Sequence, residues 1–462
     1  MASKSLEKGD LDQRAPVAPV VSRRSILRKG AVAVGGGAAT LLAGGTASGS
    51  QARPSSGQTP ANRQDRVFRA FVRYRTGASL QQLKLHPIGG RQVVIRTEAS
   101  QCCYSVVNAM LGTANTPDAT IIGHGGVGIV EEIGPMVKRV QVGDRVIVPV
   151  KPQCGACYQC LRGRGDQCAF SGGERPLTPF AEMQDGTPVL QVMNIGGPSE
   201  LMVVFEEWCC PVFTQVPAVE LSMLGCVAGT GLAAGATFVP IDPGSDVVVL
   251  GAWPVGLAAV QAARIKGAAQ VIVVEPIKYR RDVALKVGAT TVLDPNAEGD
   301  KLLETIRELC KGPTDRRFAG GRNWAATAAA TGRGPDFIFE AVGGDQFPPT
   351  VERGPDPTGL LSLQQAWDLI PGGGHLVTLG VGQSGNVTFP AGQWSNRGKT
   401  HHGGQYGGVS MMRDLPTFVR LIEHGLFDAK SLATSTFPLE RTREAFQAVA
   451  NRTTVAAVIV FD

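Results

Sequence analysis

Four closely spaced cysteines carry the most specific chemistry in this chain of 462 residues. They follow the pattern Cys154-x2-Cys157-x2-Cys160-x7-Cys168. Four thiolates can surround one zinc ion tetrahedrally, with Zn–S distances of about 2.3 Å. The alternative is a pair of disulfides, but adjacent two-residue spacings strain disulfide geometry and favour the metal. Because the protein would fill all four coordination positions, we expect this zinc to be structural.

A second motif lies in the turn that follows a buried-strand pattern at 246–250. The turn has the sequence Gly251-Ala252-Trp253-Pro254-Val255-Gly256. Nucleotide-binding proteins carry G-x-G-x-x-G at such a turn, and its second glycine lets the backbone approach a pyrophosphate. Trp253 occupies that second position, so its indole must either swing clear of the phosphates or intrude on them.

An acidic residue, Glu275, ends the next strand pattern, 19 residues after Gly256. An acid at this place suits the ribose 2′-OH of NAD and disfavours the 2′-phosphate of NADP. The alternative role is a solvated carboxylate at a strand end. The position of Glu275 after the glycine turn favours the cofactor role.

The elements that must position these residues are strands that alternate with helices. Apolar runs predict buried strands at 246–251, 270–275, 336–340 and 375–380. Alternating strands and helices predict an α/β fold with a doubly wound parallel sheet. Nearer the N-terminus, strand patterns at 67–75 and 92–99 and a Gly- and Val-rich segment at 123–149 predict a smaller β-rich unit.

The composition is that of a globular protein, and most of the net charge lies at the N-terminus. Hydrophobic residues make up 43% and charged residues 18%, which excludes wholesale disorder. The net charge is +6, but residues 1–30 hold seven basic and three acidic residues, so the remaining body is nearly balanced. Basic residues are scattered there without an aromatic–basic platform, so we expect no nucleic-acid partner.

The basic N-terminal segment predicts an export signal. Arg23 and Arg24 precede a weakly apolar, glycine-rich stretch at 31–49, as in a twin-arginine signal. The alternatives are a disordered basic tail and a transmembrane anchor, and the glycine content argues against a stable membrane helix. We predict a signal over 1–52, a linker over 53–65 and export to the periplasm, cell envelope or exterior. The protein is cytoplasmic if the signal is not used.

Several motifs spread over residues 66–462 resemble those of the zinc-containing medium-chain alcohol dehydrogenases. Besides the cysteine pattern and the glycine turn, these are GHGGVGIVEEIG from Gly123, VGDRV from Val142, LGC-x3-TG from Leu224, GPDFIFEAVG from Gly334 and FPLE-x4-AF from Phe437. The resemblance implies a Rossmann sheet and a β-rich GroES-like catalytic domain. Their expected boundaries are 66–219 for the catalytic domain with a zinc lobe at 154–168, 220–388 for the Rossmann domain and 389–462 for a return to the catalytic domain.

The resemblance also implies a second, catalytic zinc, held by Cys103, His124 and Cys226. Two cysteines and one histidine leave a fourth position open, where zinc can lower the pKa of an alcohol so that an alkoxide gives hydride to a nicotinamide. Ser105 matches a hydroxyl that starts a proton relay in the family, or is an ordinary polar strand-end residue. The implied cofactor contacts are Gly251, Trp253, Val255, Gly256 and Glu275.

Several family positions around these sites are changed. Gly125 replaces an acid that usually follows the ligand histidine, and Val106 replaces an aspartate that usually follows the relay hydroxyl. Such acids orient ligands and tune the metal, so zinc should bind more weakly or act as a stronger Lewis acid once bound. Asn108 matches the relay histidine, and Tyr104 and Ala456 match phosphate-binding arginines of some relatives.

Three further segments have expected roles. The basic run at 278–281 should be a solvated helix start near the cofactor, and the segment at 311–333 an inserted loop. His401 and His402 resemble a metal pair, but the family match places them on a strand and favours a structural role.

Together these features predict a zinc-dependent oxidoreductase that transfers hydride between a small alcohol or aldehyde and NAD, with two zinc ions per chain. Export would require tightly bound NAD with a second electron acceptor, or activity before export. Family relatives are commonly dimers or tetramers, so we expect a homo-oligomer. Two alternatives are a non-catalytic binding protein on a degenerate dehydrogenase fold and a non-redox zinc enzyme without nucleotide.

Overall fold

The computed structural model describes residues 66–172, 178–192, 195–311, 334–345, 356, 358–382, 384–392 and 397–462. Three predicted features fall outside these residues: the export signal at 1–52, the linker at 53–65 and all but the first residue of the inserted loop at 311–333. They therefore stay predictions.

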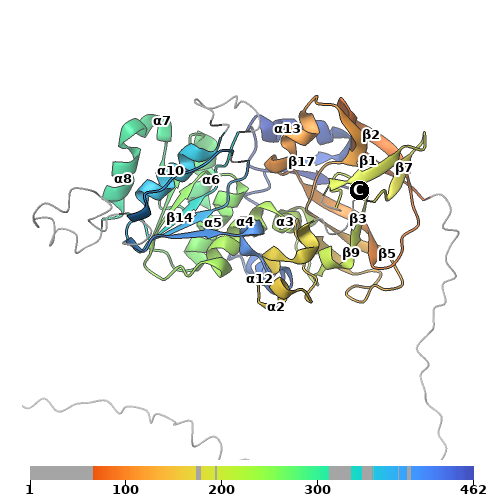
Figure 1. The fold of residues 1–462 in the computed structure, drawn as a ribbon, viewed down its shortest axis with the longest axis horizontal. Helices are drawn as coiled ribbons and strands as arrows, with labels where there is room; N and C mark the ends of the chain where they lie inside the picture. Colours follow the sequence, from red (N-terminus) through yellow and green to blue (C-terminus); the bar gives the residue numbers. More distant parts are fainter. Residues whose placement is uncertain are drawn as a thin grey trace, which may run out of the picture. The chain divides into compact units, whose positions relative to one another are not determined.

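Two β-sheets form the β-rich part of the described chain (Figure 1). One is a closed barrel in the order β1 (Val67–Arg75), β2 (Gly77–Leu85), β7 (Ala181–Met183), β8 (Pro188–Gln191) and β4 (Thr116–Ile121). The other has the order β10 (Cys210–Pro211), β6 (Arg145–Val148), β5 (Gly126–Ile133), β3 (Gln92–Gln101), β18 (Ala457–Val460) and β17 (Ser435–Pro438), and β9 (Leu201–Phe205) also pairs with β3. Phe68, Ala70 and Val72 alternate along β1 and enter the barrel core, as the two-residue period of a strand requires.

The predicted doubly wound parallel sheet is confirmed. Its order is β13 (Thr291–Leu293), β12 (Gln270–Val274), β11 (Asp246–Leu250), β14 (Phe337–Glu340), β15 (His375–Thr378) and β16 (Thr400–Gly403), with all neighbours parallel. The helices between its strands include α5 (Pro254–Ile265), α6 (Lys278–Lys286), α8 (Leu302–Leu309) and α10 (Leu360–Leu369). Val248 and Val249 enter different core clusters, so both faces of β11 are covered. This explains why its sequence is continuously apolar.

The parallel sheet extends past the domain boundary predicted at residue 388. β16 is the edge strand and pairs with β15 from His375–Thr400 to Thr378–Gly403. The return to the β-rich domain therefore begins after Gly403 rather than at 389. An edge strand needs no continuous apolar run, and β16 has none. After it come α12 (Met411–Glu423), α13 (Thr442–Ala450) and the strands β17 and β18.

Two helices connect the β-rich part to the parallel sheet: α3 (Ala218–Leu224) and α4 (Val227–Ala233). Their buried side chains share one core cluster with Ile147 of β6 and Val249 of β11. Within the described ranges, no single helix has the length and apolarity to cross a membrane, and one bent pair, 218–224 with 227–238, meets that test by length and composition only.

Three histidines meet on the last two strands of the parallel sheet. His375 Nδ1 lies 2.9 Å from His402 Nε2, and Thr378 Oγ1 lies 2.9 Å from His401 Nε2. Burial lowers the pKa of each of these three imidazoles, and the neighbouring His375 and His401 lower that of His402 further. Their ring nitrogens bond to separate partners in the sheet rather than converging on one ion.

Acidification should destabilise the fold through this histidine cluster. The folded-state pKa values lie below the unfolded value of about 6.5, so the unfolded chain binds more protons below that pH. The contribution of these histidines to the free energy of unfolding is fully present above pH ~6.5. It is lost as the pH falls through their lower folded-state pKa values. Urea unfolding at several pH values from neutral to mildly acidic should show a shallower pH dependence for His402→Asn than for the wild type. His424→Asn, at an exposed position, is the control; equal slopes for all three proteins would contradict the assignment.

Candidate functional site

The four-cysteine lobe has the geometry of a zinc site. The four Sγ atoms of Cys154, Cys157, Cys160 and Cys168 all lie within 4.8 Å of one another. The Cys154 and Cys160 sulfurs are 3.9 Å apart, close to the roughly 3.8 Å edge of a tetrahedron with Zn–S bonds of about 2.3 Å. A disulfide requires about 2.05 Å, and all ten cysteines are unbridged. The donor set therefore fits a structural zinc ion.

Backbone amides support the charge of this cluster. The N–H groups of Ala156 and Cys157 point at Cys154 Sγ over 3.4 and 3.3 Å, and the Cys154 N–H points at Cys168 Sγ over 3.3 Å. The pKa of Cys157 is lowered to about 6: burial raises it, but hydrogen bonds, led by that from the Ala169 N–H, outweigh burial. These hydrogen bonds favour the thiolate form of Cys157, which is the form that binds metal, whereas burial raises the pKa of Cys160 and of Cys168.

Three distant segments bring together the ligands expected for the catalytic zinc. Cys103 follows β3 and precedes the short helix η1 (Tyr104–Val106), His124 lies between β4 and β5, and Cys226 lies between α3 and α4. The Cys226 sulfur is 4.0 Å from Cys103 Sγ and 3.4 Å from His124 Nε2. Among the residues that the structure describes, no fourth His, Cys, Asp or Glu joins this group. Two sulfurs and one imidazole with an open fourth side fit a catalytic zinc.

The two thiols of this group differ in their readiness to ionise. The hydrogen bond with Cys226 lowers the pKa of Cys103 well below its usual value against the effect of burial, and contacts with His124 and Ser105 lower it further. The same hydrogen bond, together with burial, raises the pKa of Cys226. Ser105 Oγ donates to Cys103 Sγ over 3.1 Å. Zinc binding must therefore displace a proton from Cys226, so it should weaken as the pH falls.

The lost acids have different structural consequences at their two positions. His124 is 1% exposed, and its Nδ1 has no hydrogen-bond partner among the described residues. Val106, where the family has an aspartate, is apolar and buried. Gly125 has a φ of +77°, and a Cβ there would lie 3.1 Å from the Gly225 backbone and from Gln101 Nε2. A side chain at position 125 would be strained and tightly packed against Gly225. Position 106 already carries a buried side chain, which is valine rather than an acid.

Tyr406 supports the Cys226 turn and was not found by sequence reasoning. It lies in η9 (Gln405–Gly408) with a φ of +53°, a conformation that is strained for a non-glycine residue. Its buried hydroxyl donates a hydrogen bond to Leu224 O, two residues before Cys226. No sequence pattern marks such a tyrosine, because its role depends on packing between segments far apart in the chain.

The nucleotide turn is built as the motif predicts. β11 enters the turn and α5 leaves it with Pro254 at its first position, a common helix start. A Cβ at Gly256 would clash with the Gly251 carbonyl oxygen, so the third glycine of the motif is required here. The Glu275 carboxylate accepts from the N–H groups of Ala252 (2.7 Å) and Ile277 (3.0 Å) and is 3% exposed. The alternative of a solvated carboxylate is therefore wrong.

Trp253 occupies the position of the motif's second glycine, where a backbone would approach a pyrophosphate. Its ring meets the edge of Tyr104 at 5.6 Å, and the Arg280 guanidinium lies over it at 4.3 Å. With an indole in place of the motif's small residue, a dinucleotide fits this turn only when the indole lies clear of the phosphates. The prediction of a solvated helix start at 278–281 is wrong in part: Lys278 is exposed, but Arg280 is buried. It was missed because a run of basic residues at a helix start predicts a solvated surface.

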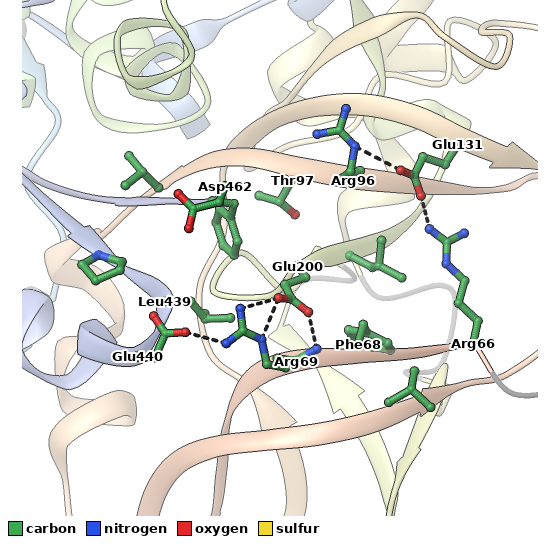
Figure 2. Close-up of a pocket in the computed structure, with 15 residues that line it drawn as sticks. Arg66, Phe68, Arg69, Arg96, Thr97, Glu131, Glu200, Leu439, Glu440 and Asp462 are labelled. Carbon is green, nitrogen blue, oxygen red and sulfur yellow. Dashed lines mark hydrogen bonds and ion pairs between the residues drawn. The ribbon is translucent and has the colours of Figure 1, made fainter.

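A pocket of about 300 Å³ lies elsewhere, between β1, β3 and the end of β18 (Figure 2). None of the predicted site residues lines it. Arg69 bridges Glu200 (2.7 Å) and Glu440 (2.5 Å), and Glu131 pairs with Arg66 and Arg96. These charges satisfy one another on the surface, where ion pairs contribute little.

Comparisons with known proteins match two segments of this chain to dehydrogenase family models. A family model described as alcohol dehydrogenase GroES-like domain matches residues 89–214, and one described as zinc-binding dehydrogenase matches 254–352. Alcohol dehydrogenase-like 6 from Arabidopsis thaliana is 27% identical over 358 residues, or 76% of this chain and 84% of that protein.

Solved structures show the same architecture. An alcohol dehydrogenase zinc-binding domain protein from Burkholderia ambifaria has a TM-score of 0.72 and 24% identity, covering 86% of this chain and 99% of its own. Benzyl alcohol dehydrogenase from Acinetobacter calcoaceticus has a TM-score of 0.70 and 25% identity, covering 86% and 100%. With its two cysteine-containing ligand groups and its Rossmann and GroES-like folds, this chain belongs to the zinc-containing medium-chain alcohol dehydrogenase family of oxidoreductases.

Proposed function

We propose that this oxidoreductase transfers hydride between a small alcohol or aldehyde and NAD, with two zinc ions per chain. The observation that carries the proposal is the group of Cys103, His124 and Cys226, whose ligand atoms lie within 4.8 Å of one another with no fourth protein ligand in the described part of the chain. A substrate oxygen can take the open position.

The residues of the site have distinct proposed roles. Cys103, His124 and Cys226 would hold the ion, which would polarise the alcohol oxygen and lower its pKa. Two thiolates balance the charge of Zn²⁺, and no carboxylate at 106 or 125 adds negative charge. Ser105 Oγ lies 3.1 Å from Cys103 Sγ, beside the ligands. Its hydroxyl would accept the proton of the alcohol while its own proton passes to water, since Ser105 is only partly buried.

NAD is the proposed hydride partner. Support comes from the retained strand–turn–helix at Gly251 and Gly256 and from the buried carboxylate of Glu275, which disfavours a 2′-phosphate nearby. We further propose that the chain is exported folded with NAD tightly bound, that a second acceptor takes the electrons, and that the protein is a homo-oligomer.

Zinc content and bound nucleotide, measured on the same purified protein, test this function. We expect two zinc ions per chain, NAD released on denaturation, and reduction of NAD by added alcohols. One zinc ion in the four-cysteine lobe without turnover would instead support a binding protein on a degenerate fold. Two zinc ions without NAD uptake would support a non-redox zinc enzyme.

A further inference from the structure

Arg280 is a buried cation without an anionic partner. It is 3% exposed, and no carboxylate in the described part of the chain pairs with it. Its Nε donates to Tyr279 Oη over 3.1 Å and its Nη2 to Thr454 O over 3.3 Å. Both acceptors are neutral. A buried charge is costly unless it is paired, so this guanidinium is suited to receive an anion.

The neighbouring cations are already paired. Arg281 forms an ion pair with Asp294 at 3.0 Å, and Lys278 with Asp282 at 2.8 Å. Arg452, whose guanidinium lies 6.0 Å from the Tyr104 ring, pairs with Asp345. Arg280 therefore differs from the other cations at this edge of the parallel sheet.

The unpaired charge lies against the glycine turn. Glu275 binds the Ala252 N–H of the turn through one carboxylate oxygen and the Ile277 N–H, just before α6, through the other. Arg280 is in the first turn of α6, and its guanidinium covers the Trp253 ring at 4.3 Å. The indole at the second-glycine position of the turn is therefore in direct contact with the guanidinium.

Two positions of the β-rich domain that could hold a phosphate-binding cation carry none in this chain. Tyr104 and Ala456 occupy positions where some relatives have phosphate-binding arginines, and Tyr104 packs its ring against Trp253. The loop before β18 docks on α6 instead, because Tyr279 Oη donates to Arg452 O over 2.7 Å and Arg280 to Thr454 O. Where some relatives have phosphate-binding arginines, this chain has the aromatic contact of Tyr104, and backbone carbonyls of the loop before β18 bind α6.

We propose that Arg280 is the phosphate-binding residue of the nucleotide site and that Trp253 is its gate. When the indole swings off the turn, the guanidinium exchanges a cation–π contact for a charge-assisted pair with a diphosphate. The exchange is favourable because a phosphate satisfies the planar fork of an arginine better than a neutral ring does. The inference rests on the proposed function in taking a dinucleotide as the natural ligand.

Binding of ADP to protein freed of bound nucleotide tests the proposal by calorimetry. Because hydrogen bonds to charged groups contribute about 1.5–3 kcal/mol, Arg280→Gln should weaken ADP binding about 10- to 100-fold. Adenosine, which lacks phosphate, should bind the variant and the wild type alike. Arg280→Lys should recover part of the loss, since it keeps the charge but not the fork. Lys278→Gln removes a charge from the same helix turn, at a side chain that is 79% exposed, and should bind ADP as the wild type does.

A substitution of Trp253 tests the gate separately, by ADP affinity and by tryptophan fluorescence. Trp253→Gly should bind ADP about 10-fold more tightly, since the ligand no longer displaces a ring from its cation–π contact. It should also lose part of the change in tryptophan fluorescence that ADP causes in the wild type. Thermal unfolding shows whether each variant is folded. If Arg280→Gln is not folded, the affinity of Arg280→Lys for ADP is compared with that of the wild type instead.

Several outcomes would overturn the proposal: no ADP binding by the wild type, equal affinity of wild type and Arg280→Gln, equal losses in Arg280→Gln and Lys278→Gln, or weaker binding by Trp253→Gly. Failure of the proposed function is distinguishable from these. Binding of ADP that depends on Arg280 without any alcohol turnover would reject the function and keep the phosphate site. Alcohol turnover with an unchanged KM for NAD in Arg280→Gln would reject the phosphate site and keep the function.

Discussion

Cys226→Ala should leave one zinc ion per chain and abolish alcohol turnover. Cys226 Sγ is one of three ligand atoms in the open group, 3.4 Å from His124 Nε2 and 4.0 Å from Cys103 Sγ. Loss of groups that merely orient metal ligands already costs about 10- to 100-fold in metal affinity or activity, so loss of a ligand should exceed that. Metal analysis after dialysis, together with NAD reduction by alcohols, provides the measurement.

Two other cysteines serve as controls for this variant. Cys310 is buried in the core beside the parallel sheet and belongs to neither ligand group, so Cys310→Ala should keep both zinc ions and turnover. Cys160→Ala should lose the other zinc ion, that of the lobe. Retention of two zinc ions by Cys226→Ala would show that the metal is held elsewhere.

Val106→Asp should tighten zinc binding at the open site by about 10- to 100-fold. When Nε2 of His124 binds the metal, Nδ1 carries a proton that has no acceptor among the described residues, and a buried unsatisfied donor is costly. By the family resemblance, an aspartate at 106 would accept a hydrogen bond from that N–H, fix the orientation of the ring and add negative charge near the ion. Competition with a zinc chelator of known affinity measures the change.

The neighbouring position provides a matched control. Val107 is also fully buried, so Val107→Asp buries the same charge without serving the imidazole. It should destabilise the fold and leave zinc affinity unchanged. If both aspartate variants are folded and bind zinc as the wild type does, an unpartnered Nδ1 does not limit affinity.

The parts of this fold that could be predicted are those decided locally. Short spacing confines the four lobe cysteines to one loop, so their convergence follows from the sequence. Continuous apolar runs at 246–250 and 270–274 predict buried parallel strands because both of their faces are covered. The convergence of Cys103, His124 and Cys226 is not local, and only the family resemblance indicated it.

Other features could not be predicted because distant segments decide them. Arg280 is buried partly because the carbonyl of Thr454, 174 residues away, accepts its hydrogen bond. Gly125 looks like a lost acid until its left-handed backbone and its contact with Gly225 are known. The strand β16 has no apolar run, since it lies at the sheet edge, so its membership depends on its pairing with β15.

The pairing of β18 with β3 also sets the order of events during biosynthesis. Val458 pairs with Gln101, and the Cys102 N–H donates to Ala457 O over 2.9 Å, directly before the ligand Cys103. β3, which precedes this ligand, pairs with β5 and β9 earlier, but it gains β18 as a neighbour only after residues 457–460 have left the ribosome. Because such long-range pairing forms slowly, the open metal centre should mature only once β18 has been synthesised, whereas the four-cysteine lobe can load zinc on the nascent chain before that.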